Sequence, residues 1–139
     1  ACVMAGSDIV ALDATGRPRL DGLSFAQTVA ALREDGTLVM ADCGSFEDAQ
    51  RAVDAGVDIV STTLAGYTGD RVKTDGPDLE LLREVVAAFP DVPVICEGRV
   101  HTPEQAAAAI EAGAFAVIVG TAITHPTSIT TWFKAAVEG

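Results

Sequence analysis

The segment Val94-Ile95-Cys96-Glu97-Gly98-Arg99-Val100-His101-Thr102-Pro103-Glu104 contains the residue order from which the fold follows. Its short apolar run Val94–Cys96 is typical of a buried strand, and Glu97 and Gly98 come directly after it. The triplet Thr102-Pro103-Glu104 then has the order of a helix N-cap, a first-turn proline and a first-turn acid. A strand that leads through a carboxylate and a glycine into a helix is the unit of a parallel α/β barrel. Such barrels keep their chemistry at the carboxyl ends of the strands.

The same alternation of strand and helix runs along the rest of the chain. Short β-branched or apolar runs predict five strands, at Ile9–Leu12, Leu38–Ala41, Ile59–Thr62, Val94–Cys96 and Ala116–Val119. Capping residues and helical spacing predict helices at Phe25–Asp35, Phe46–Ala55, Asp78–Phe89, Pro103–Ala112 and Ser128–Val137. Strict alternation implies an α/β fold whose parallel sheet has right-handed crossovers.

An internal repeat favours a barrel over a doubly wound sheet. Ala5-Gly6-Ser7-Asp8-Ile9-Val10 recurs as Ala55-Gly56-Val57-Asp58-Ile59-Val60 and as Ala112-Gly113-Ala114-Phe115-Ala116-Val117. A complete (β/α)8 barrel typically needs about 250 residues, whereas this chain has 139. We therefore expect residues 1–139 to form a single domain: either the last five βα units of a TIM-type barrel without its N-terminal strands, or a smaller open α/β sheet. Residues 1–6 look like the last turn of a helix, which predicts an incomplete chain.

Composition excludes several classes of function. The formal net charge is −11 and no basic stripe occurs, so we expect no nucleic-acid partner. An anionic ligand would need a local site of backbone N–H groups. No apolar run is long enough to cross a membrane, and no signal peptide is present. The three cysteines have no CxxC spacing and are interpreted as reduced thiols, which predicts a cytoplasmic protein.

Three carboxylates and two glycines follow predicted strands. Asp13, Asp42 and Glu97 lie at strand ends, where each could serve catalysis or simply accept hydrogen bonds in its loop. Gly98, Arg99, Gly120 and Thr121 form a candidate phosphate site, with residues 121–123 as a short helix. Arg99 could instead pair with a surface acid.

The long segment Leu64–Pro77 could be a lid over a ligand. Tyr67 could cover a sugar, and Thr63 could bind its hydroxyls or merely finish a strand. Arg71 and Lys73 are expected to be exposed to solvent. Trp132 and Phe133 on the last helix are predicted core or dimer contacts. No metal-ligand spacing or nucleotide motif occurs, so we expect no metal and no cofactor.

Several ordered motifs resemble one family, N-acetylmannosamine-6-phosphate 2-epimerase (N-acylglucosamine-6-phosphate 2-epimerase). They are Ile9-Val10-Ala11-Leu12-Asp13-Ala14-Thr15, Arg17-Pro18, Asp21-Gly22, Met40-Ala41-Asp42, Thr62–Thr68, Gly76-Pro77-Asp78, Glu97-Gly98-Arg99, His101–Glu104 and Val119–Thr124. The resemblance covers essentially the whole chain. It implies a (β/α)8 barrel, usually dimeric, that interconverts N-acetylmannosamine 6-phosphate and N-acetylglucosamine 6-phosphate by inverting C2, as in sialic acid catabolism.

The resemblance also implies residue roles. The family glutamate that acts as acid or base aligns with Glu97, and an active-site aspartate aligns with Asp42. The family's lysine base and a substrate-site arginine belong to the first three strands, to which no residue here corresponds. Many members have arginine where this chain has His125, which weakens the case for a side-chain contact to phosphate there.

Two other functions remain open at the level of sequence. One is another phosphate-binding barrel enzyme, of the ribulose-phosphate epimerase or thiazole synthase type. The other is a half-barrel that binds a sugar phosphate without catalysis, because the lysine is absent from this chain. Open strand edges predict that the chain aggregates, pairs with a copy as a homodimer, or is part of a longer chain.

Overall fold

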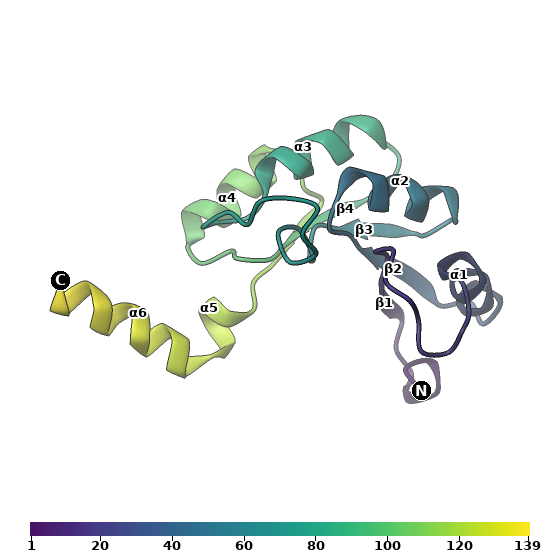
Figure 1. Ribbon diagram of the computed structural model, residues 1–139, viewed down its shortest axis with the longest axis horizontal. Coiled ribbons are helices and arrows are strands. Elements are labelled where there is room, and N and C mark those ends of the chain that lie inside the picture. The colour runs from purple at the N-terminus through teal and green to yellow at the C-terminus, as the bar shows by residue number, and fades with distance from the viewer.

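The computed structural model describes all 139 residues and contains one parallel five-stranded sheet. The strand order along the sheet, β1-β2-β3-β4-β5, is the order of the strands along the chain (Figure 1). The strands are β1 (Ile9–Asp13), β2 (Leu38–Asp42), β3 (Ile59–Ser61), β4 (Val94–Glu97) and β5 (Ala116–Ile118). All five predicted strands are confirmed, with ends that differ by one residue.

A helix follows each strand, and local signals in the sequence fix where the helices begin. The elements are the 3-10 turn η1 (Val3–Ala5) and the helices α1 (Phe25–Glu34), α2 (Phe46–Asp54), α3 (Leu79–Ala88), α4 (Pro103–Glu111), α5 (Thr121–Thr124) and α6 (Pro126–Glu138). Ser24, Ser45 and Thr102 each form a capping box at a helix start. These side chains satisfy N–H groups that the first helical turn leaves without a partner.

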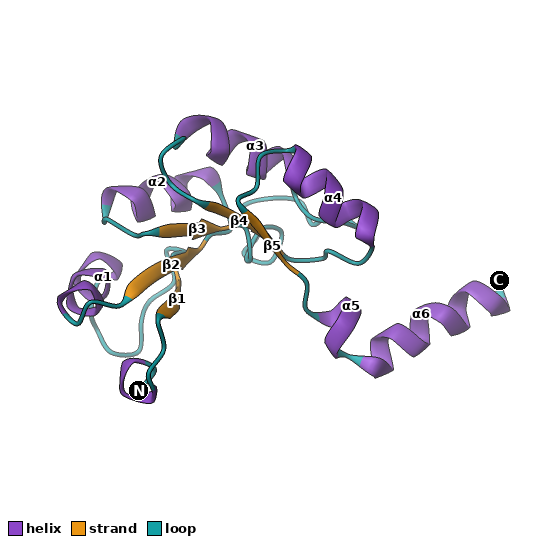
Figure 2. Cartoon of the chain, turned by 180° about the vertical axis from the view of Figure 1, so that it is seen from behind, coloured by secondary structure: helices purple, strands orange, loops and turns teal.

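The core lies between the sheet and the helices on its outer face. Figure 2 shows α2, α3 and α4 along the convex side of the curved sheet. Alternate strand residues point to this side, where Val39, Val60, Val94 and Cys96 are almost completely buried. On the opposite, concave face Ile9, Leu38 and Ile118 remain partly exposed. The sheet therefore has one covered face and one open face.

The register of the parallel strands brings their carboxyl ends to one edge of the sheet. Asp13 pairs with Asp42, and Glu97 pairs with Ile118. Each carboxylate is the last residue of its strand. Successive side chains alternate between the faces of a strand, so these three carboxylates share the concave face with Ile9 and Leu38.

The last two helices stand away from the body of the molecule. Figures 1 and 2 show α5 and α6 extending beyond β5 as an arm. Trp132 contacts His101 with ring centroids 4.8 Å apart, but Phe133 and Val137 on α6 are exposed. Of the two roles predicted for Trp132 and Phe133, a place in the core is not found, because both side chains are exposed. A contact between subunits stays a prediction. No helix of the chain has both the length and the apolar character needed to cross a membrane.

Candidate active site

The strand-end carboxylates lie in different surroundings. Glu97 is held in place through its backbone: its N–H donates to Thr62 Oγ1 (3.2 Å), and Thr62 Oγ1 donates to its carbonyl (3.1 Å). These two bonds fix the end of β4 against the end of β3. The Glu97 side chain is thereby aimed along the concave face beside Asp42 rather than into solvent.

Thr63 joins the two predicted catalytic carboxylates. Its Oγ1 lies 2.9 Å from Asp42 Oδ1 and 2.9 Å from Glu97 Oε2. Ser61 Oγ lies 2.7 Å from the same Thr63 oxygen and 3.5 Å from Glu97 Oε2. Four side chains from three adjacent strand ends thus form one polar cluster, which we call the Thr63 cluster.

Burial and like charge act together on Asp42. Loss of solvent raises the pKa of the Asp42 carboxyl, and the nearby carboxylates of Glu97 and Asp13 raise it further, against the hydrogen bond from Thr63. A carboxyl with a raised pKa can hold a proton closer to neutral pH. Asp42 therefore favours its neutral form more than a solvent-exposed aspartate does.

Asp13 has the opposite electrostatic character. Slight burial raises its pKa, but hydrogen bonds from Thr15 and the charge of Arg17 outweigh that effect and hold the pKa below its usual value. Its Oδ1 accepts bonds from the backbone N–H (2.9 Å) and the hydroxyl (2.6 Å) of Thr15. Asp13 is thus engaged in its own loop, as the structural interpretation of the sequence expected, and a substrate contact by Asp13 stays a prediction.

A cavity of about 350 Å³ opens next to the Thr63 cluster. Seven predicted site residues line it: Thr63, Tyr67, Glu97, Gly98, Arg99, Gly120 and Thr121. They come from the ends of β3, β4 and β5. The structure therefore brings Glu97 and the four predicted phosphate-site residues to one cavity, while Asp13 and Asp42 lie outside its lining.

Close backbone approach explains glycine at position 98. Gly98 has φ +101°, and a Cβ there would lie 3.3 Å from the carbonyl oxygen of Thr63. A side chain at this position would be strained and would press on the cluster. Gly120 is the N-cap of the short predicted helix α5, which the structure confirms at Thr121–Thr124.

Arg99 faces the long loop rather than open solvent. Its Nη1 donates to the carbonyl of Ala65 (2.7 Å) and its Nε to the carbonyl of Gly76 (3.1 Å). Nη2 donates to Thr74 Oγ1 (3.0 Å), and the guanidinium lies 5.1 Å from the Tyr67 ring. Arg99 therefore ties both ends of the Leu64–Pro77 loop to the end of β4. A direct phosphate contact by Arg99 stays a prediction.

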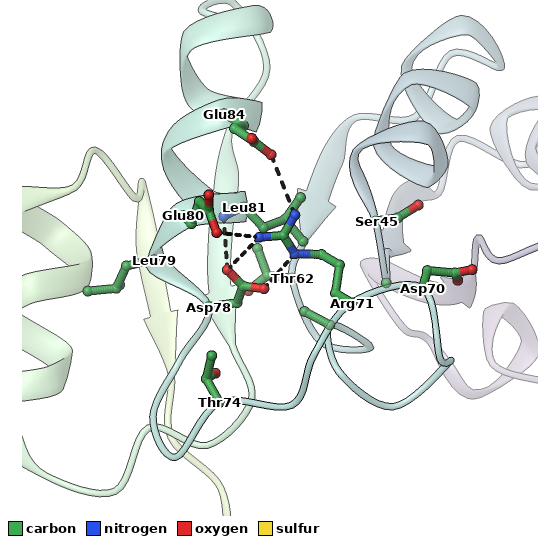
Figure 3. Close-up of polar contacts among 12 residues, drawn as sticks. Ser45, Thr62, Asp70, Arg71, Thr74, Asp78, Leu79, Glu80, Leu81 and Glu84 are labelled. Carbon is green, nitrogen blue, oxygen red and sulfur yellow. Dashed lines mark hydrogen bonds and ion pairs between the residues drawn. The ribbon is translucent and has the colours of Figure 1, made fainter.

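A second arginine secures the same loop, contrary to the expectation that it is exposed. Arg71 Nε lies 2.7 Å from Asp78 Oδ2, and further ion pairs join Arg71 to Glu80 and Glu84 (Figure 3). Asp78 is buried and also accepts from the backbone N–H of Leu81, so it caps α3. Only 22% of the Arg71 side chain is exposed, because the loop folds back on the start of α3. Lys73 is exposed, as predicted.

Sequence reasoning did not single out Ser61, which is completely buried and bonded to Thr63. The available signal was a run of hydroxyl residues, Ser61-Thr62-Thr63, at a strand end. Alternation along the strand assigns Ser61 and Thr63 to one face and Thr62 to the other. No cluster of three His, Cys, Asp or Glu side chains has an arrangement that could hold a metal ion.

The fold and the site together define a class: consecutive βα units of a parallel barrel, with two linked carboxyls and a glycine-lined cavity at the carboxyl ends of the strands. A family model described as "Putative N-acetylmannosamine-6-phosphate epimerase" matches residues 1–139. The chain belongs to this N-acetylmannosamine-6-phosphate epimerase family.

Curated relatives agree with the family model. A protein of Cutibacterium acnes, named "Putative N-acetylmannosamine-6-phosphate 2-epimerase", is 58% identical over 140 residues, which are 99% of this chain and 61% of the relative. A protein of the same name from Corynebacterium glutamicum is 49% identical over 131 residues, covering 94% of this chain and 56% of the relative. The chain thus spans little more than half of the length of these relatives.

Solved structures confirm the barrel. The N-acetylmannosamine-6-phosphate 2-epimerase from Clostridium perfringens superimposes with a TM-score of 0.89 at 43% identity, over 93% of this chain and 56% of the epimerase. FabK from Thermotoga maritima matches with a TM-score of 0.65 at 23% identity, over 87% of this chain and 35% of FabK, which is a likeness of fold alone. The chain is a partial (β/α) barrel, as the repeat predicted.

Proposed function

We propose that the protein to which these residues belong is a sugar-phosphate 2-epimerase, an isomerase that interconverts N-acetylmannosamine 6-phosphate and N-acetylglucosamine 6-phosphate. The observation that carries the proposal is the pair Asp42 and Glu97, joined through Thr63 at the rim of a cavity of about 350 Å³. Cavities that bind small molecules start at about 300 Å³. Membership of the epimerase family supports the choice of substrate.

The reaction inverts C2, a carbon next to the carbonyl carbon of the open-chain sugar. Removal of the C2 proton leaves an enolate, whose oxygen must be stabilised or protonated, and a proton must return to C2 from the other face. We assign Glu97, which lines the cavity, as the acid that gives a proton to the substrate, with Asp42 in support. Resemblance to the family places the lysine base on earlier strands of the barrel, outside these residues.

The phosphate is proposed to lie where the loops after β4 and β5 meet. Gly98 and Gly120 leave room for close backbone approach, and Thr121 adds a hydroxyl at the same wall of the cavity. Arg99 contributes positive charge while its N–H groups hold the loop. Tyr67, which is 53% exposed above this wall, could cover the bound sugar.

Further parts of the proposal concern the setting of the enzyme. They are a cytoplasmic location, a role in sialic acid catabolism and a homodimeric state, which the resemblance to the family implies. The proposed reaction needs no metal and no cofactor, because both proton transfers use side chains. The exposed apolar residues of α6, including Phe133, are candidates for the contact between subunits.

The test is exchange at C2 in heavy water with N-acetylmannosamine 6-phosphate and the natural full-length protein. We expect deuterium at C2 of both epimers, and we expect Glu97→Gln to slow the exchange by about 100-fold or more, as loss of a general acid does. Glu104→Gln, an exposed first-turn substitution in α4, is the matched control and should exchange normally. No deuterium uptake by the folded natural protein would overturn the proposal.

A further inference from the structure

A single side chain, that of Arg99, holds the cavity side of the Leu64–Pro77 loop. Its three nitrogens donate to three acceptors: the carbonyl of Ala65 (2.7 Å), the carbonyl of Gly76 (3.1 Å) and Thr74 Oγ1 (3.0 Å). These acceptors come from the beginning and from the end of the loop. The N–H groups of a guanidinium form a rigid fork, so one arginine can join the two arms of the loop.

The carbonyl of Ala65 depends on this arginine. Ala65 is only 1% exposed, and no backbone N–H donates to its carbonyl oxygen. Arg99 Nη1 is the donor that this oxygen has within the chain. A buried carbonyl without a partner is costly. Loss of the Arg99 fork would therefore favour an open loop, in which water can reach the Ala65 carbonyl.

The backbone at position 99 also points to a role for the side chain. Arg99 has φ +56° and is the one residue of the chain, glycines aside, with a positive φ. Glycine adopts this conformation readily, whereas a Cβ makes it unfavourable. A residue stays in such a conformation where its surroundings hold it there, and this strain is typical of functional positions. The three bonds of the guanidinium provide that hold.

The loop has a second anchor, but that anchor lies away from the cavity. Arg71 joins the loop to the start of α3 through Asp78 and does not line the cavity. Arg99 and Tyr67 both line it, and the Arg99 guanidinium lies 5.1 Å from the centre of the Tyr67 ring. Lys73 Nζ lies 5.2 Å from the same ring. Cations at such distances attract an aromatic ring, so both side chains help to hold Tyr67 at the cavity.

We propose that Arg99 is a positioning residue that holds the Leu64–Pro77 loop against the end of β4 and thereby fixes Tyr67 as one wall of the cavity. The inference rests on the proposed epimerase function for the use of this wall by a sugar phosphate, and not for the closure of the loop. It assigns the need for arginine at this position to the loop rather than to a contact with phosphate.

The first measurement is hydrogen exchange at the backbone amides of Ala65 and Tyr67, in the full-length protein without substrate. These amides donate to the carbonyls of Thr62 and Leu64, so they exchange when the loop opens. Arg99→Lys keeps the positive charge but removes the fork. We expect exchange at both amides to become about tenfold faster, the equivalent of one lost hydrogen bond to a charged group. Unchanged exchange would overturn the proposal.

Two further variants separate the fork from other effects of the substitution. Arg99→Gly relieves the strained φ and should also accelerate exchange at both amides. Normal exchange in Arg99→Gly would assign the effect to backbone strain and overturn the proposal. Arg33→Lys is the matched control, because Arg33 also donates to a loop carbonyl, that of Gly56, at a place remote in the chain from Tyr67. It should leave both amides unchanged.

The kinetics of C2 exchange test the use of the wall. Arg99→Lys should raise KM by about tenfold with little change in kcat, because it weakens binding of ground state and transition state alike. Tyr67→Ala should raise KM by itself, and adding Arg99→Lys should then raise it no further, since Arg99 acts through the Tyr67 ring. Effects that multiply in the double variant would indicate a direct contact of Arg99 with the substrate and would overturn the proposal.

The two proposals fail in different ways. If the full-length protein shows no C2 exchange while Arg99→Lys accelerates amide exchange, the epimerase function fails and the closure of the loop by Arg99 stands. If C2 exchange is present and KM is normal in Arg99→Lys, the epimerase function stands and the assignment of Tyr67 as a wall fixed by Arg99 is overturned.

Discussion

Two aspartates at equivalent strand ends show how surroundings decide the character of a residue. Asp13 and Asp42 are direct neighbours in the register of β1 and β2. The pKa of Asp13 is lowered because the bonds from Thr15 and Arg17 favour its charged form despite partial burial. The pKa of Asp42 is raised because deeper burial and the nearby charge of Glu97 disfavour its charged form. The same position in the fold thus yields a loop anchor in one unit and a carboxyl with a raised pKa in the next.

At Gly98 the backbone itself is part of the site. We predict that Gly98→Ala lowers the free energy of unfolding by about 1–2 kcal/mol, because alanine is disfavoured at the positive φ and its Cβ would approach the Thr63 carbonyl. Thermal unfolding measures this loss of stability. The added Cβ should also displace Thr63 and slow turnover, which C2 exchange measures.

Gly69→Ala is the matched control for this substitution. Gly69 also has a positive φ, +91°, but nothing lies within 4 Å of a Cβ placed there. It should therefore show a similar loss of stability and a normal exchange rate. Equal exchange rates in the two variants would contradict the importance of the close approach at Gly98.

Among the elements, the β3–α3 loop was the hardest to predict and the helices were the easiest. Helix starts follow from adjacent residues: Ser24, Ser45 and Thr102 cap the next turn through local hydrogen bonds. The ion pair of Arg71 with Asp78 depends instead on the path of the loop, which no local rule fixes. Glycines and polar residues indicate a loop but do not indicate how it folds back.

The candidate site shows the same difference between what local sequence predicts and what depends on the tertiary arrangement. Strand ends marked Asp42 and Glu97 as candidates, and the resemblance to the family singled them out from other strand-end carboxylates. The contacts of Thr63 with both of them depend on the register of three strands, which the sequence alone does not specify. The burial of Ser61 and the attachment of Arg99 to the loop carbonyls depend on the same tertiary arrangement.

Among the ion pairs of Arg71, the pair with buried Asp78 should contribute most to the stability of the fold. We predict that Asp78→Ala lowers the free energy of unfolding by about 2–3 kcal/mol, since it removes both the cap of α3 and the buried partner of Arg71. Glu80→Ala, which removes an outer partner that is 79% exposed, should cost less than about 0.5 kcal/mol. Chemical denaturation at neutral pH measures both, and equal effects would contradict the assignment.

The same variant has a defined pH dependence. Burial raises the pKa of Asp78, but the bonds from Arg71 and Leu81 outweigh it, so the pKa is lowered on folding. A lowered pKa stabilises the fold above the usual range of an aspartate, and this stabilisation is lost as the pH falls toward the lowered value. The stability difference between the natural protein and Asp78→Ala should therefore shrink in acid, below about pH 4.

On the scale of the whole molecule, the open surfaces are the dominant feature. The sheet has free edges at β1 and β5, its concave face exposes Ile9 and Leu38, and α6 exposes Phe133 and Val137. Exposed apolar surface and unpaired strand edges favour association. The apolar pattern of Trp132 and Phe133 predicted a core or dimer contact, but the described residues provide no surface that covers Phe133.

Residues 1–139 expressed alone should therefore self-associate at micromolar concentration. Light scattering coupled to gel filtration measures the mass, and Phe133→Ser together with Val137→Ser should reduce it. Exposed polar substitutions of equal number on the same helix, Thr130→Ser and Thr131→Ser, should not. A monomer with a cooperative melting transition would contradict the prediction.

The sequential strand order has a consequence for how the protein is made. Each of the strands β2 to β5 pairs with the strand that precedes it in the chain. Within β1 to β5, each pairing therefore needs only the next βα unit and does not wait for a more distant segment. As the polypeptide leaves the ribosome, every new βα unit meets a finished neighbour on which to add. The growing sheet can thus lengthen one unit at a time, and the carboxyls of Asp42 and Glu97 are brought together only when the third and fourth units have been added.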